Sequence, residues 1–176
     1  MKITIAILEK FINAIGYICA ALMLLMLFTV FYDVLSRYLF NSVSIGMQEL
    51  EWHFFAAMFM FGIGYTLKED GHVRVDVFFD KMSPRKQAWI DLIGSLFFAL
   101  PIAILILYYG ISYAHDSYVM NEGSGDPGGL PNRWIIRAVI PASAGFLILS
   151  IFYVVLVRVE VLLGMIEPPK HKGVEL

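Results

Sequence analysis

Four long stretches without a charged residue occupy most of this chain, and short polar segments separate them. They cover residues 11–32, 52–67, 92–114 and 138–157. About 20 mostly apolar residues cross the hydrocarbon core of a bilayer as a helix, because the backbone there must satisfy its own hydrogen bonds. The second stretch reaches this length when the helix begins near residue 47. The pattern predicts an all-α membrane protein with four transmembrane helices, at about 11–32, 47–67, 88–114 and 134–157.

Lysine and arginine are distributed unevenly over the segments between these helices, although the net charge is only −2. Three of the 13 lie in the first and third loops, at Arg37, Arg133 and Arg137. The others lie in the N-terminal segment, the second loop and the C-terminal segment. Because cytoplasmic loops carry the excess of positive charge, both termini and the second loop are predicted to be cytoplasmic. The first stretch is too long for the apolar core of a signal peptide, so we expect a retained helix.

The second loop contains a short amphipathic pattern at about 73–82. Its apolar positions, Val75, Phe78, Phe79 and Met82, follow helical spacing, and charged residues occupy the other side. This spacing is typical of a helix that lies on a membrane surface or against a partner. Alternating valines also permit a strand, but an isolated strand would leave its edges unpaired. We therefore expect a cytoplasmic amphipathic helix within a single membrane domain, 1–176.

The outer segments carry the charges that are candidates for contacts with partners. Residues 115–131 form a loop rich in glycine and proline, and Arg133 and Arg137 follow in the first turns of the fourth helix. Positive charge at a helix N-terminus opposes the helix dipole. The two arginines therefore need anionic lipid headgroups, a carboxylate such as Glu49 or Glu51, or a partner protein. Asp33 and Arg37 are four residues apart and are predicted to form a pair on one helix face.

The sequence offers no constellation of catalytic residues, metal ligands or phosphate-binding glycines, so neither an enzyme nor a cofactor is expected. His53 and His115 begin and end two predicted helices at the outer side, which leaves open a haem-bearing anchor of a respiratory enzyme. Charge within the spans, the usual sign of a transport pathway, is almost absent. A free-standing small transporter is therefore the less favoured alternative. Pro101 is expected to kink the third helix.

Four motifs together resemble one family. They are the segments 33–41 (DVLSRYLFN), 48–53 (QELEWH), 72–76 (HVRVD) and 130–141 (LPNRWIIRAVIP). Their order and spacing relative to the four spans are similar to those in the small membrane subunit of tripartite ATP-independent periplasmic (TRAP) transporters, over about residues 10–160. Many members begin the second helix with two adjacent acids. Here Glu49 matches this position and Gln48 departs from it.

The resemblance implies a division of labour. In such systems a periplasmic protein captures an organic anion, typically a carboxylate, and a large polytopic subunit carries it with sodium. The small subunit, in the bacterial inner membrane, braces the large one and helps dock the binding protein. It would contact these two proteins and membrane lipid, and no nucleic acid. The candidates for partner contacts are Arg37, Glu49, Arg133 and Arg137 outside, and Val75, Phe78, Phe79 and Met82 at the cytoplasmic side.

Overall fold

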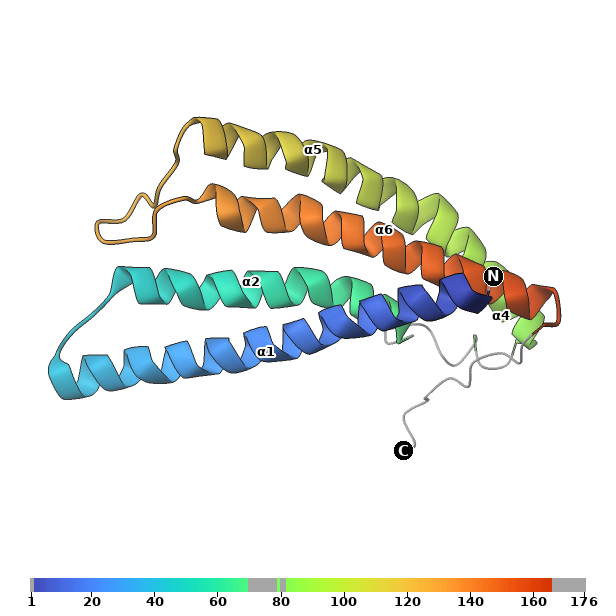
Figure 1. Cartoon of the computed structure of the whole chain (residues 1–176), viewed down its shortest axis with the longest axis horizontal. Coiled ribbons are helices and arrows are strands. Elements are labelled where there is room, and N and C mark those ends of the chain that lie inside the picture. Colours follow the sequence, from blue (N-terminus) through green and yellow to red (C-terminus); the bar gives the residue numbers. More distant parts are fainter. Residues whose placement is uncertain (1, 70–78, 80–81, 166–176) are drawn as a thin grey trace.

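The chain forms an elongated bundle of long helices (Figure 1). A computed structural model describes residues 2–69, 79 and 82–165. The helices in chain order are α1 (Lys2–Phe40), α2 (Ile45–Lys68), α4 (Pro84–Gly94), the π-helical turn η1 (Ser95–Ala99), α5 (Leu100–Val119) and α6 (Trp134–Leu162). The α1–α2 turn and the α5–α6 loop lie at one end of the bundle (Figure 1). The beginning of α1 and the end of α6 lie toward the other end, as the sequence leads us to expect.

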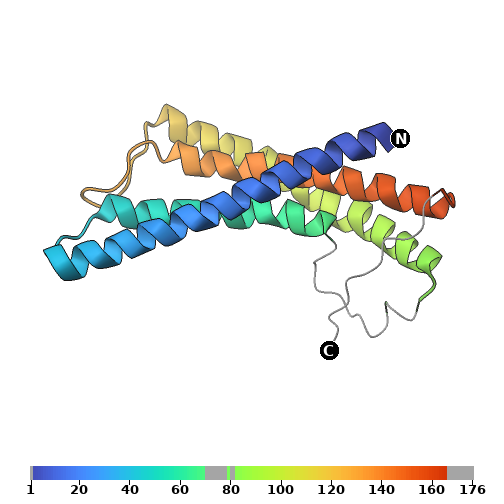
Figure 2. The ribbon, with the colours of Figure 1, turned by 60° about the horizontal axis from the view of Figure 1, so that its bottom comes forward.

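Helix α6 is the centre of the bundle, because it contacts each of the other helices. Its buried positions include Ser143, Phe146, Ser150, Val154 and Arg158, which recur every three or four residues and so form one continuous face. Helix α1 crosses this assembly obliquely (Figure 2). Only two residues of α1 are buried, so most of its apolar surface is uncovered.

Small residues bring α5 close to α6. The buried residues of α5 are Ala103, Gly110 and Ser117, which are seven positions apart and therefore share one stripe of the helix. A Cβ atom on Gly110 would lie 3.2 Å from the ring of Pro141. Small side chains at a helix interface let two backbones approach closely, which is the usual way in which helices pack within membranes.

Three helical segments are long and apolar enough to cross a membrane, namely α1, the continuous segment Pro84–Val119, and α6. The all-helical class is therefore confirmed. Helix α2 has 24 residues, about 36 Å at 1.5 Å per residue, and it carries Glu49 and Glu51 near its start. Its length is sufficient for a span, but its polar first turns set it apart from the other three. The fourth span stays a prediction.

The helices are generally longer than the predicted spans. Helix α1 begins at Lys2 and includes the charged residues that follow, because a helix can continue beyond the hydrocarbon core. Helix α5 continues to Val119, so the first five residues of the predicted outer loop 115–131 are helical. The helix ends where Asn121 adopts a positive φ of 48° and the Glu122 N–H donates to the Ser117 carbonyl. This is the hydrogen bond of a Schellman C-cap.

A π-helical turn, η1, ends directly before Leu100 and Pro101, near the site where the sequence predicts a kink. The N–H of Leu100 donates to the carbonyl of Ser95, five residues earlier. Proline lacks an N–H and its ring collides with the carbonyl four residues earlier, and a widened turn is one way to accommodate it. The predicted amphipathic helix 73–82, with Val75 and Phe78, lies mostly outside the described residues. Phe79 is buried, and Met82 is 37% exposed.

Candidate functional site

The outer end of the bundle contains a compact arrangement that we call the outer cap. It consists of the loop 120–133, the first turns of α2 and the first turns of α6. The loop lies at the same end of the bundle as the turn between α1 and α2 (Figure 1). In the orientation predicted from the sequence, this end faces away from the cytoplasm.

Glu49 connects α2 to the loop. Helix α2 begins after Ser44, whose hydroxyl accepts a hydrogen bond from the N–H of Met47 and so caps the helix. One turn further, Glu49 is 9% exposed. Its Oε1 accepts a hydrogen bond from the hydroxyl of Ser124, and its Oε2 accepts one from the N–H of Leu130 at 2.5 Å. A single carboxylate thus holds both arms of the loop, and such charge-assisted hydrogen bonds are stronger than neutral ones.

Glycines permit this close approach. A Cβ atom on Gly129 would lie 2.8 Å from Glu49 Oε2 and even closer to the side chain of Ser124. A Cβ atom on Gly46, at the start of α2, would lie 3.3 Å from the carbonyl oxygen of Gly128. The loop also closes on itself, since the N–H of Ser124 donates to the carbonyl of Leu130 at 3.0 Å. The loop conformation therefore depends on glycine at 129 as well as on the carboxylate.

Arg137 fixes the second half of the outer cap. Its guanidinium lies 2.5 Å from Glu122 Oε1 and 4.2 Å above the ring centroid of Tyr113, and its side chain is 19% exposed. The sequence left open headgroups, Glu49, Glu51 or a partner as its counterpart, and the contact that is present is Glu122. Within the described part of the chain, the side chain of Arg133 makes no hydrogen bond or ion pair. Arg133 is attracted electrostatically to Glu49 but keeps the donors of its guanidinium free of described partners, so it is the more available of the two arginines.

Arg37 pairs with Asp33, as the sequence predicts. The distance from Arg37 Nη2 to Asp33 Oδ2 is 2.7 Å. Asp33 is one of the two buried residues of α1, whereas 47% of the Arg37 side chain is exposed. The pair neutralises a carboxylate near the outer end of α1 and leaves one side of the guanidinium open to solvent, headgroups or a partner.

The end of the bundle opposite the outer cap holds an ion pair that sequence reasoning missed. Asp91 of α4 and Arg158 of α6 approach to 2.8 Å, with side chains 6% and 8% exposed respectively. The sequence places both residues at the edges of apolar stretches, where each alone looks like an interfacial charge. Only the packing of α4 on α6 brings them together. No signal in the sequence pairs two residues so far apart in the chain.

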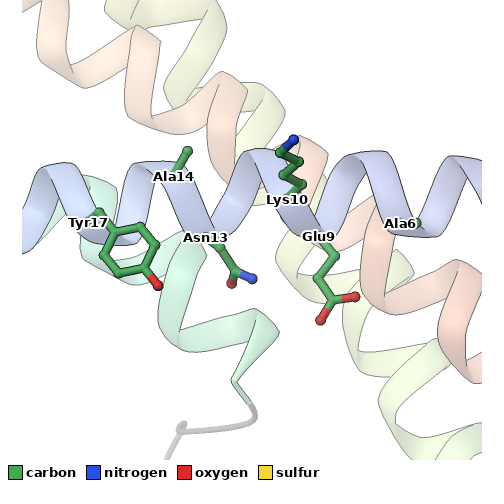
Figure 3. A pocket seen from close by; sticks show the side chains of 6 residues that line it. All are labelled: Ala6, Glu9, Lys10, Asn13, Ala14 and Tyr17. Carbon is green, nitrogen blue, oxygen red and sulfur yellow. The ribbon is translucent and has the colours of Figure 1, made fainter.

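A second polar contact at this end joins α1 to the last turn of α2. Lys68 Nζ lies 2.9 Å from Asn13 Oδ1 and 2.6 Å from Glu69 Oε1. It also lies 3.7 Å from Glu9 Oε1. An open hollow of about 420 Å³ lies beside this contact (Figure 3). Its lining consists of residues of α1: Ala6, Glu9, Lys10, Asn13, Ala14 and Tyr17.

The described residues contain no group of three or more histidine, cysteine, aspartate or glutamate side chains that could hold a metal ion. His53 lies with Nδ1 2.5 Å from the carbonyl oxygen of Glu49. His115 has a side chain that is 70% exposed. Helix α6 lies between α2 and α5, which carry these two histidines (Figure 1). The structure therefore does not bring His53 and His115 to a common haem site.

The long apolar helices and the polar contacts at both ends define an integral membrane protein of the helical-bundle class. Residues 26–161 match the family model described as "Tripartite ATP-independent periplasmic transporters, DctQ component". Because the match covers more than half of the chain, the chain belongs to this family. It is also 29% identical over 151 residues to a Haemophilus influenzae protein named "Putative TRAP transporter small permease protein". That alignment covers 84% of this chain and 94% of the relative. The resemblance drawn from the four motifs is confirmed, and the chain is a transporter component.

Proposed function

We propose that this chain is the non-catalytic small subunit of a secondary transporter for organic anions, most simply carboxylates. In this proposal it braces a large polytopic transport subunit in the bacterial inner membrane and helps dock a periplasmic substrate-binding protein. Membership of the family supports the assignment to a transporter. The bracing and docking roles rest on the surfaces that the bundle leaves uncovered.

The observation that carries the bracing role is the uncovered surface of α1. Of its 39 residues, only Ile12 and Asp33 are buried. The helix is about 58 Å long at 1.5 Å per residue, about twice the thickness of a bilayer's hydrocarbon core. If the bundle worked alone, lipid would cover this apolar surface. In the proposed complex, helices of the large subunit would pack against part of it.

The arrangement of charge favours an auxiliary subunit over a free-standing transporter. A transport pathway within a bundle normally presents ionisable groups to its interior. Among the buried charges of the described residues, Asp91 and Arg158 form a pair with each other at 2.8 Å. They hold α4 on α6, and such a mutually neutralised pair is a structural contact rather than a binding site for an anion.

The proposed topology has α2 as the fourth span and both termini in the cytoplasm. The distribution of lysine and arginine supports this orientation. The start of α1 and the end of α6 lie toward the same end of the bundle, which also supports it (Figure 1). The outer cap is then periplasmic, where Arg133 and the exposed side of Arg37 are the proposed contacts for acidic residues of the binding protein.

The proposed cytoplasmic contact is the amphipathic segment 73–82. Its apolar positions Val75, Phe78 and Met82 would lie on the membrane surface or against the large subunit, whereas Phe79 is buried within this chain. Replacing Phe78 with serine is then expected to weaken assembly with the large subunit, whereas Phe79→Ser would also disturb the packing of this chain. Unchanged assembly would remove this segment from the proposal.

Reconstitution tests the proposed function. Liposomes would contain the large subunit with and without this chain, and the binding protein loaded with a labelled organic anion would be supplied outside. We expect uptake that depends on this chain. Full uptake by the large subunit alone would contradict the bracing role, and uptake by this chain alone would replace it with an independent transporter.

A further inference from the structure

The carboxylate of Glu49 is placed unusually for a charge near the start of a membrane helix. It is 9% exposed, and it points into the loop rather than toward solvent or a headgroup layer. Both of its oxygens are used, one by the hydroxyl of Ser124 and the other by the N–H of Leu130. These two donors lie six residues apart on opposite arms of the loop. The carboxylate therefore acts as a clasp that closes the loop.

Three further contacts depend on the closed loop. The N–H of Ser124 donates to the carbonyl of Leu130 at 3.0 Å, and the N–H of Arg133 donates to the carbonyl of Glu122 at 2.8 Å. Glu122 in turn pairs with Arg137. The closed loop thus fixes the position of Arg133, which lies at the junction between the loop and α6. The residues at the tip of the loop, 125–128, are exposed in this conformation.

We infer that Glu49 is a positioning residue, whose clasp holds the loop 120–133 in the conformation that the periplasmic substrate-binding protein recognises. This inference rests on the docking role in the proposed function and assigns it to a particular conformation. A flexible loop with several glycines loses conformational freedom when it binds a partner, which weakens the complex. A loop that is already closed loses less, and the position of Arg133 is fixed before the encounter.

The structure offers two independent ways to open the loop. Glu49→Ala removes both acceptors. Gly129→Ala leaves the carboxylate in place but inserts a Cβ atom 2.8 Å from Glu49 Oε2. The matched control is Gly62→Ala, on the same helix as Glu49 but outside the outer cap, because a Cβ atom there meets nothing within 4 Å. If Glu49 acts through the loop, the first two variants share one phenotype and the control resembles the wild type.

The first readout is hydrogen exchange, measured by mass spectrometry on the full chain in complex with the large subunit in nanodiscs. In the wild type, we expect the amides of Ser124 and Leu130 to be protected by their hydrogen bonds. Exchange at both should be about tenfold or more faster in Glu49→Ala and Gly129→Ala, since charge-assisted hydrogen bonds are lost or distorted. Equal protection in all variants would overturn the clasp.

The second readout is the affinity of the substrate-loaded binding protein for the same nanodiscs. We expect about tenfold weaker binding for Glu49→Ala and Gly129→Ala, unchanged binding for Gly62→Ala, and equal recovery of the large subunit in every sample. Ser124→Ala should weaken binding in the wild-type background and have no further effect in Glu49→Ala. Normal affinity in Glu49→Ala and Gly129→Ala, despite faster exchange of the loop amides, would overturn the inference. The docking role itself would still stand if Arg133→Glu bound the protein more weakly. No binding by the wild type would contradict both.

Discussion

The contact between α2 and α6 gives a sharp test of the bundle, because it depends on a glycine. A Cβ atom on Gly64 would lie 2.7 Å from two ring atoms of Phe146 and 3.0 Å from Ser150 Oγ. The ring cannot move away easily. Phe146 is 4% exposed, and its centroid lies 6.2 Å from that of Phe11 and 6.0 Å from that of Phe61. Gly64→Ala should therefore force the two helices apart or the ring into a poorer rotamer.

The control variant is Gly62→Ala, on the same helix, where a Cβ atom meets nothing within 4 Å. Both variants gain up to about 1 kcal/mol of helix propensity. Only Gly64→Ala also overpacks the contact, which typically costs about 1–3 kcal/mol. With roughly 2–4 °C per kcal/mol for a chain of this size, Gly64→Ala should melt about 2–12 °C below Gly62→Ala.

The assay is tryptophan fluorescence of the purified chain in mild detergent, followed during heating. Adding Phe146→Leu to Gly64→Ala should recover part of the loss, because it gives space at the contact. Equal melting temperatures for the two alanine variants would refute the close approach of α2 to α6. No recovery by Phe146→Leu would assign the loss to another neighbour.

Three further predictions address the buried ion pair, the docking surface and the orientation. Asp91→Asn removes the negative charge that lies 2.8 Å from Arg158 and should cost about 3–5 kcal/mol, whereas replacing both by leucine should recover most of the loss in the same melting assay. Arg133→Glu should weaken binding of the periplasmic protein without changing membrane insertion, and unchanged affinity would leave only a contact with headgroups. With Cys19 replaced by serine, Gly125→Cys should react with an impermeant maleimide from outside, and Lys86→Cys only after permeabilisation; the reverse pattern would contradict the proposed orientation.

The sequence predicted the helices well, because apolar runs without charge reflect a physical requirement of the bilayer. It was less accurate where helices continue beyond the hydrocarbon. Helix α1 begins at Lys2, and α5 continues to Val119. Polar residues are compatible with a helix in either place, and the end of α5 is set by the left-handed conformation of Asn121. Counting charges cannot detect such an end.

The contacts of the outer cap were harder to predict. The pairing of Asp33 with Arg37 follows from a spacing of four residues on one helix, and it was predicted. The clasp joins Glu49 to Ser124, which is 75 positions away, and to Leu130, which is 81 positions away. It also needs a glycine at 129. Sequence reasoning identified Glu49 as a candidate but not its donors. Such contacts follow from the way in which α2 packs against α6, which a single sequence does not reveal.

The central claim is that this chain works as part of a larger transporter. The most direct measurement is to purify the tagged chain from gently solubilised native membranes and identify what accompanies it. The account predicts a large polytopic membrane protein in a constant ratio to this chain. Recovery of the chain alone, stable and monodisperse, would contradict the claim, and recovery of a redox enzyme would return attention to His53 and His115.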